Sequence, residues 1–456
     1  MNRIVEGLRK SRMAKWPLEV WFLLIASVLG VAFILLLPPG QSPDDISHFR
    51  RAYGITEGAL IPGVVNDIGG VGSNVPVDVV DVLESFPRSG YYGEILNDLG
   101  RGVAEESVQS YNNAALYNFI CYLPQSLAIL IGKMFGASTM LLAYLARIFN
   151  FILWIILTYF AIRIIPCFKK IILFIALLPI TLQEATSLSP DALTIGLGFF
   201  IVSYVLYLSY VKRSVMSRWE VGLLYLVAAV IGFCKIVYLP LVLLYLVIPE
   251  TRFGSKKKKL LHLTIIGVVA AVLNVIWLII SSGFLMEFKP GIDSKGQLMW
   301  IFSHPLGYLV TIVRTIVMNM EIWTSSMLGM HLGAFVFNLP TIVFLSSFAI
   351  FILLFAQKDE HLRMSVYNKI VFAVTFLIIT LLIFTSLYMQ WTPVGEAVID
   401  GVQGRYFLPI LLLLPTILNS GKNKKPNSTL VSSRFVLCYS LVVNIIALTV
   451  IFMQNK

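Results

Sequence analysis

The chain has 456 residues, of which 58% are hydrophobic and 13% are charged. Soluble domains carry about 25% charged residues, so this composition excludes an ordinary soluble protein. Apolar segments of about 20 residues recur along the chain and predict a polytopic α-helical membrane protein. The formal net charge of +11 is concentrated in short basic loops such as residues 256–259, which are typical of cytoplasmic topology signals rather than of a nucleic-acid surface.

Neither the cysteines nor the glycines indicate a cofactor site. Cys121, Cys167, Cys234 and Cys438 lie in or beside apolar segments, with a spacing that fits neither a zinc site nor a disulfide framework. The chain has no GxxxxGK[ST] and no GxGxxG pattern, so nothing predicts nucleotide binding. We therefore expect that no cofactor is required, and a divalent metal stays open as a possibility.

The first apolar segment, residues 18–37, follows a basic N-terminus and predicts a retained anchor with that end in the cytoplasm. The next residues, 38–112, are expected outside and carry 11 of the 24 acidic residues. Residues 116–135 are apolar but include Tyr117, Gln125 and Lys133. If both this segment and residues 140–162 crossed the membrane, the basic cluster Arg163, Lys169 and Lys170 would lie outside, against the positive-inside rule. We therefore expect residues 116–135 to be a juxtamembrane helix on the outer surface. The first outer loop then extends over about 38–137.

The remaining apolar segments alternate with basic loops. Spans are expected at 140–162, 168–187, 192–211, 260–280, 339–355, 370–388, 405–418 and 435–452, with a short hairpin at 219–249 whose halves meet near Lys235. A second outer region is expected at about 281–336. The total is about eleven transmembrane helices in a single domain over 1–456, with the C-terminus outside.

Polar residues at the outer ends of these segments are candidates for a functional site. They are Asp44, Asp45, His48, Gln183, Glu184, Asp191, Lys235, Gln403 and Arg405. Charge at a membrane boundary is costly and points to function. A carboxylate there can act as general base for a hydroxyl group, and Lys or Arg can bind a phosphate and stabilise it as a leaving group. The groups needed to activate the acceptor hydroxyl and to stabilise the leaving phosphate in a glycosyl transfer from a lipid phosphate are therefore both available.

Five motifs together resemble a known family. They are Pro43-Asp44-Asp45-x-x-His48-Phe49-x-Arg51-Ala52, Tyr122-Leu123-Pro124-Gln125, Arg147-x-x-Asn150, Leu188-Ser189-Pro190-Asp191-Ala192 and Gly401-Val402-Gln403-Gly404-Arg405-Tyr406-Phe407-Leu408-Pro409. From about residue 38 to 410, the chain resembles a bacterial family of uncharacterised multi-pass membrane proteins that is grouped with the GT-C glycosyltransferases. The resemblance implies an all-α, GT-C-like fold with juxtamembrane helices in the first outer loop.

The same resemblance implies roles for individual residues. Either Asp44 or Asp45 would be the catalytic base, Asp191 a second acid on the outer face, and Lys235 a contact to the donor phosphate. We expect Arg405 to hold the same phosphate. The supporting residues are His48, Gln403, Tyr406, Arg147 and Glu184. GT-C enzymes carry an Asp pair or an Asp-x-Asp variant, and the adjacent Asp44-Asp45 leaves open which carboxylate acts and whether a metal is bound.

The sequence thus predicts an inverting GT-C glycosyltransferase of the bacterial cytoplasmic membrane. It would transfer a sugar from a polyprenyl-phosphate donor to a cell-envelope polysaccharide on the outer face. The expected partners are the lipid-linked sugar, the glycan acceptor and membrane lipids, and no nucleic acid. Two alternatives are a transporter or flippase of lipid-linked sugars and a non-catalytic protein that binds them.

The candidate residues also have structural interpretations. Asp44 and Asp45 follow Pro43, and Asp191 follows Pro190, so these aspartates can cap or begin a helix. His48 can join the carboxylates at a metal or make a structural hydrogen bond. Further alternatives are an extension of Lys235 to the lipid headgroups, an ion pair of Arg147 with Glu184, and a loop-to-helix turn at Gln403–Arg405.

Overall fold

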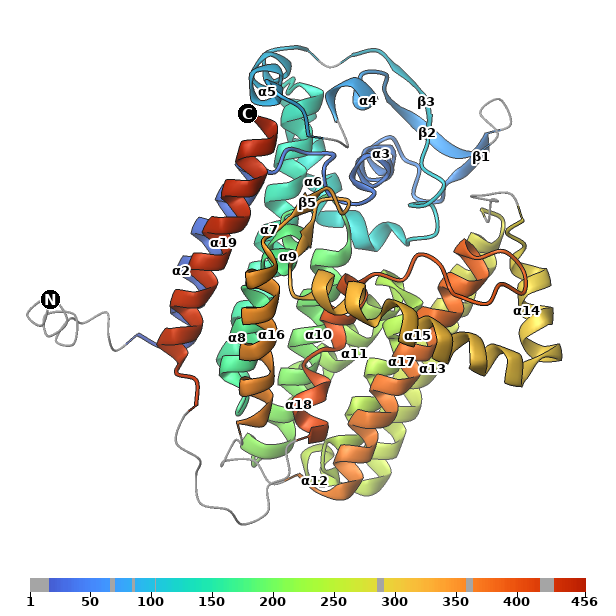
Figure 1. The fold of residues 1–456 in the computed structure, drawn as a ribbon. Helices are drawn as coiled ribbons and strands as arrows, with labels where there is room; N and C mark the ends of the chain where they lie inside the picture. Colours follow the sequence, from blue (N-terminus) through green and yellow to red (C-terminus); the bar gives the residue numbers. More distant parts are fainter. Residues whose placement is uncertain are drawn as a thin grey trace, which may run out of the picture.

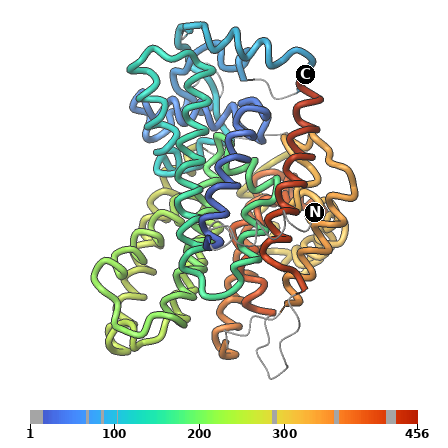
Figure 2. The backbone as a smooth tube through the Cα atoms, turned by 90° about the vertical axis from the view of Figure 1, so that its left-hand side faces the viewer, coloured from blue at the N-terminus to red at the C-terminus, as the bar shows by residue number. Residues whose placement is uncertain are grey.

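The computed structural model describes residues 16–65, 70–83, 87–102, 104–284, 291–357, 364–418 and 430–456. The basic segment 1–15, on which the predicted cytoplasmic N-terminus depends, lies outside these residues. Long helices form a bundle, and the described residues between 38 and 137 form a cap at one end of it (Figures 1 and 2).

Seven helices of the described residues are long and apolar enough to cross a membrane. They are α2 (Leu18–Leu36), α7 (Thr139–Ile164), α10 with the π-turn that follows it (Asp191–Val211), α13 (Lys256–Ser282), α15 (Pro305–Met327), α17 (Val366–Trp391) and α19 (Ser433–Asn455). Helices dominate because apolar segments in lipid must satisfy their main-chain groups internally. The chain is therefore a helical membrane protein, as the sequence predicts.

Two of the expected spans, and the expected hairpin at 219–249, consist of short pieces rather than continuous helices. Residues 168–187 form α8 (Lys169–Ala176) and α9 (Pro179–Ala185), residues 219–249 form α11 (Arg218–Cys234) and the 3-10 helix η5 (Ile236–Val247), and residues 405–418 lie in the 3-10 helix η6 (Gly404–Ile410) and α18 (Leu413–Leu418). Prolines lie in or at the start of these pieces, where they remove a backbone donor. The expected total of about eleven spans is not confirmed, but the predicted break near Lys235 is present.

The region between α13 and α17 contains shorter elements. They are α14 (Ser294–Ser303), α15, the strand pair β4 (His331–Leu332) and β5 (Phe337–Asn338), and α16 (Thr341–Ala356). Although α15 has the length of a span, Figure 1 shows it running across the bundle rather than parallel to α17. Its neighbour in the fold is η6, which carries one of the candidate site residues, Arg405.

The cap contains a small sheet that the sequence analysis does not predict. Strands β1 (Gly63–Val65), β2 (Gly70–Pro76) and β3 (Glu106–Ser110) pair antiparallel in the order β1-β2-β3. Glycine and valine dominate the middle strand. Both residues have a low helix propensity, and their order shows no helical periodicity. The all-α expectation is therefore wrong for this part of the chain. The helices of the cap are α3 (Asp45–Thr56), α4 (Val79–Val82), α5 (Tyr91–Leu99), η3 (Phe119–Tyr122) and α6 (Leu123–Met134).

Helix α6 packs against the first half of α7 in an antiparallel hairpin. The connection between them is four residues long, and Gly132 lies so close to Leu142 and Leu145 that an added Cβ would clash with both. Apolar side chains on the opposite face of α6 are exposed, among them Leu127 and Met134. Such a face is typical of a helix in contact with lipid.

The C-terminal helix fastens the cap to the bundle. Gln41 and Asn455 exchange two side-chain hydrogen bonds, of 2.7 and 3.1 Å, and both residues are buried. The Gly90 N–H donates to the carbonyl of Lys456 at 2.9 Å. The loop that precedes α3 is thereby held from the opposite end of the chain.

A labelling experiment tests the predicted topology. In a Cys438→Ser background, which removes the exposed cysteine, we expect Ser89→Cys in the cap and Phe135→Cys at the end of α6 to react with a membrane-impermeant maleimide in intact cells. Ser214→Cys, in the basic loop after α10, should react only after permeabilisation. If Phe135→Cys behaves like Ser214→Cys, then α6 crosses the membrane and the predicted topology is wrong.

Candidate functional site

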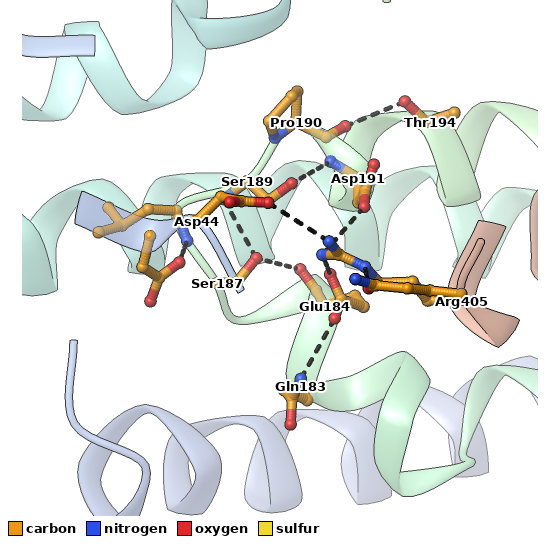
Figure 3. A network of polar contacts seen from close by, with 12 residues as sticks. Asp44, Gln183, Glu184, Ser187, Ser189, Pro190, Asp191, Thr194 and Arg405 are labelled. Carbon is orange, nitrogen blue, oxygen red and sulfur yellow. Dashed lines mark hydrogen bonds and ion pairs between the residues drawn. The ribbon is translucent and has the colours of Figure 1, made fainter. Parts of the chain in front are cut away.

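Five of the candidate residues meet around the guanidinium of Arg405 (Figure 3). Its Nη1 lies 3.1 Å from Glu184 Oε2 and 3.5 Å from Asp191 Oδ2, and its Nη2 lies 3.5 Å from Asp44 Oδ2. Its Nε donates to Gln403 Oε1 at 2.7 Å. The planar fork of an arginine presents five N–H donors in fixed directions and can therefore serve several carboxylates at once, whereas a lysine offers three donors at a single point. Arg405 therefore joins the loop before α3, the end of α9 and the start of α10.

Asp44 is the exposed carboxylate of this network. Its side chain is 40% exposed, and Asn113 Nδ2 donates to its Oδ1 at 2.8 Å. The residue precedes α3 with a left-handed backbone (φ 62°), yet its side chain makes no capping hydrogen bond. Left-handed geometry is uncommon outside glycine and is often found at functional sites. The capping interpretation of Asp44 is therefore wrong.

Asp45, the adjacent residue, is buried and faces another way. Its carboxylate accepts hydrogen bonds from the Gly40 N–H at 3.1 Å and the Leu188 N–H at 2.9 Å. Burial raises the pKa of Asp45 to about 6, against the lowering effects of Arg147 and the two N–H donors. Asp45 thus ties the loop before α3 to the segment between α9 and α10. Of the two carboxylates, only Asp44 remains open to a substrate.

Lys235 lies at the break between α11 and η5 and points into the network. Its ammonium pairs with Asp191 and lies 5.5 Å from the ring centre of Tyr117 and 5.2 Å from that of Tyr406. Tyr238 donates a hydrogen bond to the carbonyl of Tyr406 at 2.8 Å and closes this aromatic box. Because the side chain of Lys235 is only 13% exposed, its charge does not extend to the lipid headgroups.

Asp191 and Gln403 contribute to the site through their side chains rather than as caps. Pro190 precedes α10 as its N-cap, and the carboxylate of Asp191 bridges Lys235 and Arg405. Gln403 precedes η6 without capping it and holds Arg405 instead. Asp191 does begin α10 as an acid in its first turn, but its interpretation as an N-cap is wrong.

His48 forms a hydrogen bond beside the network. Its Nδ1 lies 2.7 Å from the hydroxyl of Tyr122. Burial lowers the pKa of His48 to about 4, so the ring is neutral at physiological pH. Within the described residues, no three His, Cys, Asp or Glu side chains are grouped as a metal site would require.

Arg147 does not pair with Glu184, as the sequence analysis considered. Glu184 is held by Arg405, and Arg147 donates to the carbonyls of Thr186 at 2.5 Å and Leu37 at 2.7 Å. Asp45 lies near enough to interact with its charge. The reason is geometric, because α7 carries Arg147 to the back of the loop before α3, whereas Glu184 faces η6. Arg147 therefore supports the site from behind.

A cavity of about 370 Å³ begins at the network. Its polar end is formed by Asp44, Asn113, Lys235 and by the rings of Tyr117 and Tyr406. Its walls come from α13 and α17 and are largely apolar, with Trp277, Leu278, Ile383, Leu387 and Trp391 among them. A cavity that is apolar with a few convergent charged groups at one end suits an amphiphilic ligand.

Several lining residues were missed by the sequence analysis. Asn113, Tyr117, Tyr238 and Trp277 lie in segments that are otherwise unremarkable by motif or charge. The position of Asn113 just before the predicted juxtamembrane helix 116–135, and of Tyr117 in its first turn, was the available signal, because it predicts that both lie at the same membrane face as Asp44.

Fold and site together define a polytopic helical membrane protein with a buried ion network at one end of a cavity. The chain belongs to the family described as predicted membrane protein (DUF2142), which it matches over residues 27–414. That range contains every residue of the network. No curated protein and no solved structure matches the chain.

Replacing Arg147 tests its structural role. We expect Arg147→Met to destabilise the protein by about 3–5 kcal/mol, because it leaves several buried carbonyls without their hydrogen-bond donor and the buried carboxylate of Asp45 without a nearby positive charge. Thermal unfolding in detergent measures the effect. The control is Arg163→Met, which removes an exposed arginine near the other end of the same helix and should leave the melting temperature nearly unchanged. Equal melting temperatures for the two variants would contradict the role of Arg147.

The neutral state of His48 has a consequence for pH-dependent stability. The ordinary pKa of 6.5 falls to about 4 in the folded protein, so between these values the unfolded chain binds more protons. His48 therefore contributes stability above pH 6.5 that is lost as the pH falls to 4. We expect the wild type to lose more thermal stability than His48→Gln between pH 7 and pH 4.5. The opposing contribution of Asp45 is present in both proteins and cancels in the comparison.

Proposed function

We propose that this protein is a GT-C-type inverting glycosyltransferase. It takes a sugar from a polyprenyl-phosphate donor and adds it to a cell-envelope polysaccharide at the outer face of a bacterial cytoplasmic membrane. The observation that carries the proposal is that one exposed carboxylate, Asp44, and the ammonium of Lys235 both lie at the polar end of a largely apolar cavity. A base, a phosphate-binding cation and room for a lipid are therefore available in one place.

The proposed reaction begins with Asp44. Its carboxylate takes the proton of an acceptor hydroxyl, and the oxygen attacks the anomeric carbon from the side opposite the phosphate. The bond between that carbon and the phosphate oxygen breaks, and its electron pair leaves with the lipid phosphate. The proton on Asp44 passes to water. Inversion follows from the attack on the opposite side.

The neighbours of Asp44 support this role. Asn113 and Arg405 hold the carboxylate at the cavity through a hydrogen bond and an ion pair. Lys235 and Arg405 provide positive charge for the departing phosphate, and Tyr117 and Tyr406 shield Lys235 from water. Asp45 serves in the proposal as an anchor for the loop, and Asp44 alone is the base.

The finer architecture belongs to the same proposal. We propose a GT-C-like arrangement of about eleven spans. The spans beyond the seven long helices would come from the interrupted helices and from the shorter apolar helices Phe119–Met134, Ile236–Val247 and Thr341–Ala356. A cytoplasmic N-terminus would then put the cap and the cavity mouth outside.

The Asp44→Asn variant tests the proposal. In a deletion strain, the wild-type gene should restore the sugar composition of the envelope polysaccharide, and Asp44→Asn should not. Loss of a general base lowers the rate on the order of 10²- to 10⁴-fold. Asp81→Asn, which changes an exposed carboxylate elsewhere in the cap, is the matched control and should restore the glycan fully.

The same variant separates the alternatives. A transferase without its base still binds the lipid-linked sugar, so purified Asp44→Asn should retain donor binding while product is lost. A flippase or a non-catalytic binder would yield an unchanged polysaccharide from Asp44→Asn cells. That result would refute the transferase proposal.

A further inference from the structure

The charges of the network do not balance. Arg405 and Lys235 supply two positive charges, whereas Asp44, Glu184 and Asp191 supply three negative ones. The nearby His48 adds no charge, because its pKa is lowered to about 4. The Arg147 charge is matched by Asp45 behind the site. When all three carboxylates are ionised, the empty site therefore carries one surplus negative charge in a largely buried position.

An anionic ligand increases this surplus. A phosphodiester that settles beside Lys235 brings one further negative charge into a place with little water to screen it. Lys235 is already paired with Asp191, and the guanidinium of Arg405 is already shared by three carboxylates. The cations alone do not compensate the ligand, so binding requires either loss of a carboxylate contact or uptake of a proton.

The three carboxylates differ in how well each is compensated. Asp191 contacts both cations, and Asp44 is 40% exposed and reaches water. The side chain of Glu184 is fully buried, and Arg405 is its single cationic partner among the described residues. Its other polar contact is the Gln183 amide, which donates at 3.2 Å. A buried carboxylate whose partner is drawn to another anion is the group that gains most from protonation.

We propose that the site takes up one proton on Glu184 when it binds a singly charged phosphodiester beside Lys235. The inference rests on the proposed function only in taking a lipid phosphodiester as the ligand. The site should therefore prefer a ligand with a single negative charge. A dianionic phosphate monoester would require a second proton, and the network has no other carboxylate as fully buried as Glu184 to take it up. Donor and released lipid phosphate would then differ in affinity, which favours product release.

The other groups around Glu184 do not replace it as proton acceptor. From the elements packed against α9, the charged groups that interact with Glu184 are Arg405 on η6 and Asp191 on α10. Arg147 on α7 and His331 on β4 also lie on neighbouring elements, whereas Glu19 on α2, Lys169 and Lys170 on α8 and Arg434 on α19 lie at the ends of their helices that are remote from the cap. Arg147 donates to the carbonyl of Thr186, and His331 is hydrogen-bonded to Asn338 on β5. Beyond them lie Asp44, His48 and Lys235, which face the other side of Arg405.

The experiment uses the purified full chain and a farnesyl methyl phosphodiester. This probe keeps one negative charge between pH 5 and pH 9, so any pH dependence of its binding comes from the protein. Its affinity for the wild type should fall as the pH rises, by up to about tenfold per pH unit where the proton is taken up. Calorimetry in two buffers of different ionisation enthalpy should give an uptake near one proton per ligand.

Glu184→Gln assigns the proton. It keeps the size and a hydrogen-bond acceptor for Arg405 but carries no charge, so we expect tighter binding at pH 8 and a flat pH profile. Glu57→Gln, which removes a carboxylate paired with Lys133 in the cap, is the matched control and should retain the wild-type slope. Farnesyl phosphate, a dianion at high pH, should bind the wild type more weakly than the diester at pH 8.

The outcomes are separable. A flat profile in the wild type with no proton uptake overturns the proposal, whatever the variant does. A flat profile in Asp44→Asn together with an unchanged slope in Glu184→Gln moves the proton to Asp44 and overturns the assignment. Proton-linked binding in a protein that transfers no sugar leaves this inference standing and defeats the proposed function alone.

Discussion

The contact on which the site depends is the guanidinium of Arg405 among three carboxylates. Glu184, Asp191 and Asp44 come from three separate segments, and without a central cation they would repel one another at short range. A buried ion cluster is expensive to form, and its value lies in fixing geometry more than in adding stability. Arg405 itself is fixed by Gln403, so one turn at the start of η6 determines where the loop before α3, α9 and α10 meet.

The neighbouring residues Asp44 and Asp45 have different roles: the Asp44 carboxylate faces the cavity, and the Asp45 carboxylate is buried and anchors the loop. The left-handed backbone at Asp44 directs its side chain toward the cavity and places Asp45 at the first turn of α3. Asp45 then binds two backbone N–H groups and compensates Arg147. A strained residue persists only where its surroundings determine it, and here the next residue supplies that constraint.

The sequence was sufficient to predict which residues gather at one site, but not which of them touch. Hydropathy and loop charge place Asp44, Glu184, Asp191, Lys235 and Arg405 at the same depth, and the break at Lys235 follows from two helical halves that are too short to span. The rotation of each helix about its axis cannot be derived from such patterns. For that reason the partner of Arg147, the tyrosines around Lys235 and the division of labour between Asp44 and Asp45 emerged only from the structure.

The small sheet illustrates a second limit. Residues 70–76 have neither the apolar periodicity of a helix nor the alternation of a long strand. Besides the nearby strand β1, they pair with β3, whose residues lie 30 to 38 positions away. Pairing at such separation is decided by tertiary context, which local propensity does not contain.

The exchange of hydrogen bonds between Gln41 and Asn455 has a bearing on how the protein matures. The two residues are separated by 414 positions, so the loop that presents Asp44 lacks this support until the ribosome has made nearly all of the chain and α19 has entered the membrane. The polar end of the cavity is thus among the last parts to be secured during synthesis. A nascent chain stalled before α19 would carry its other helices and its cap while the loop at Asp44 still lacked this clamp.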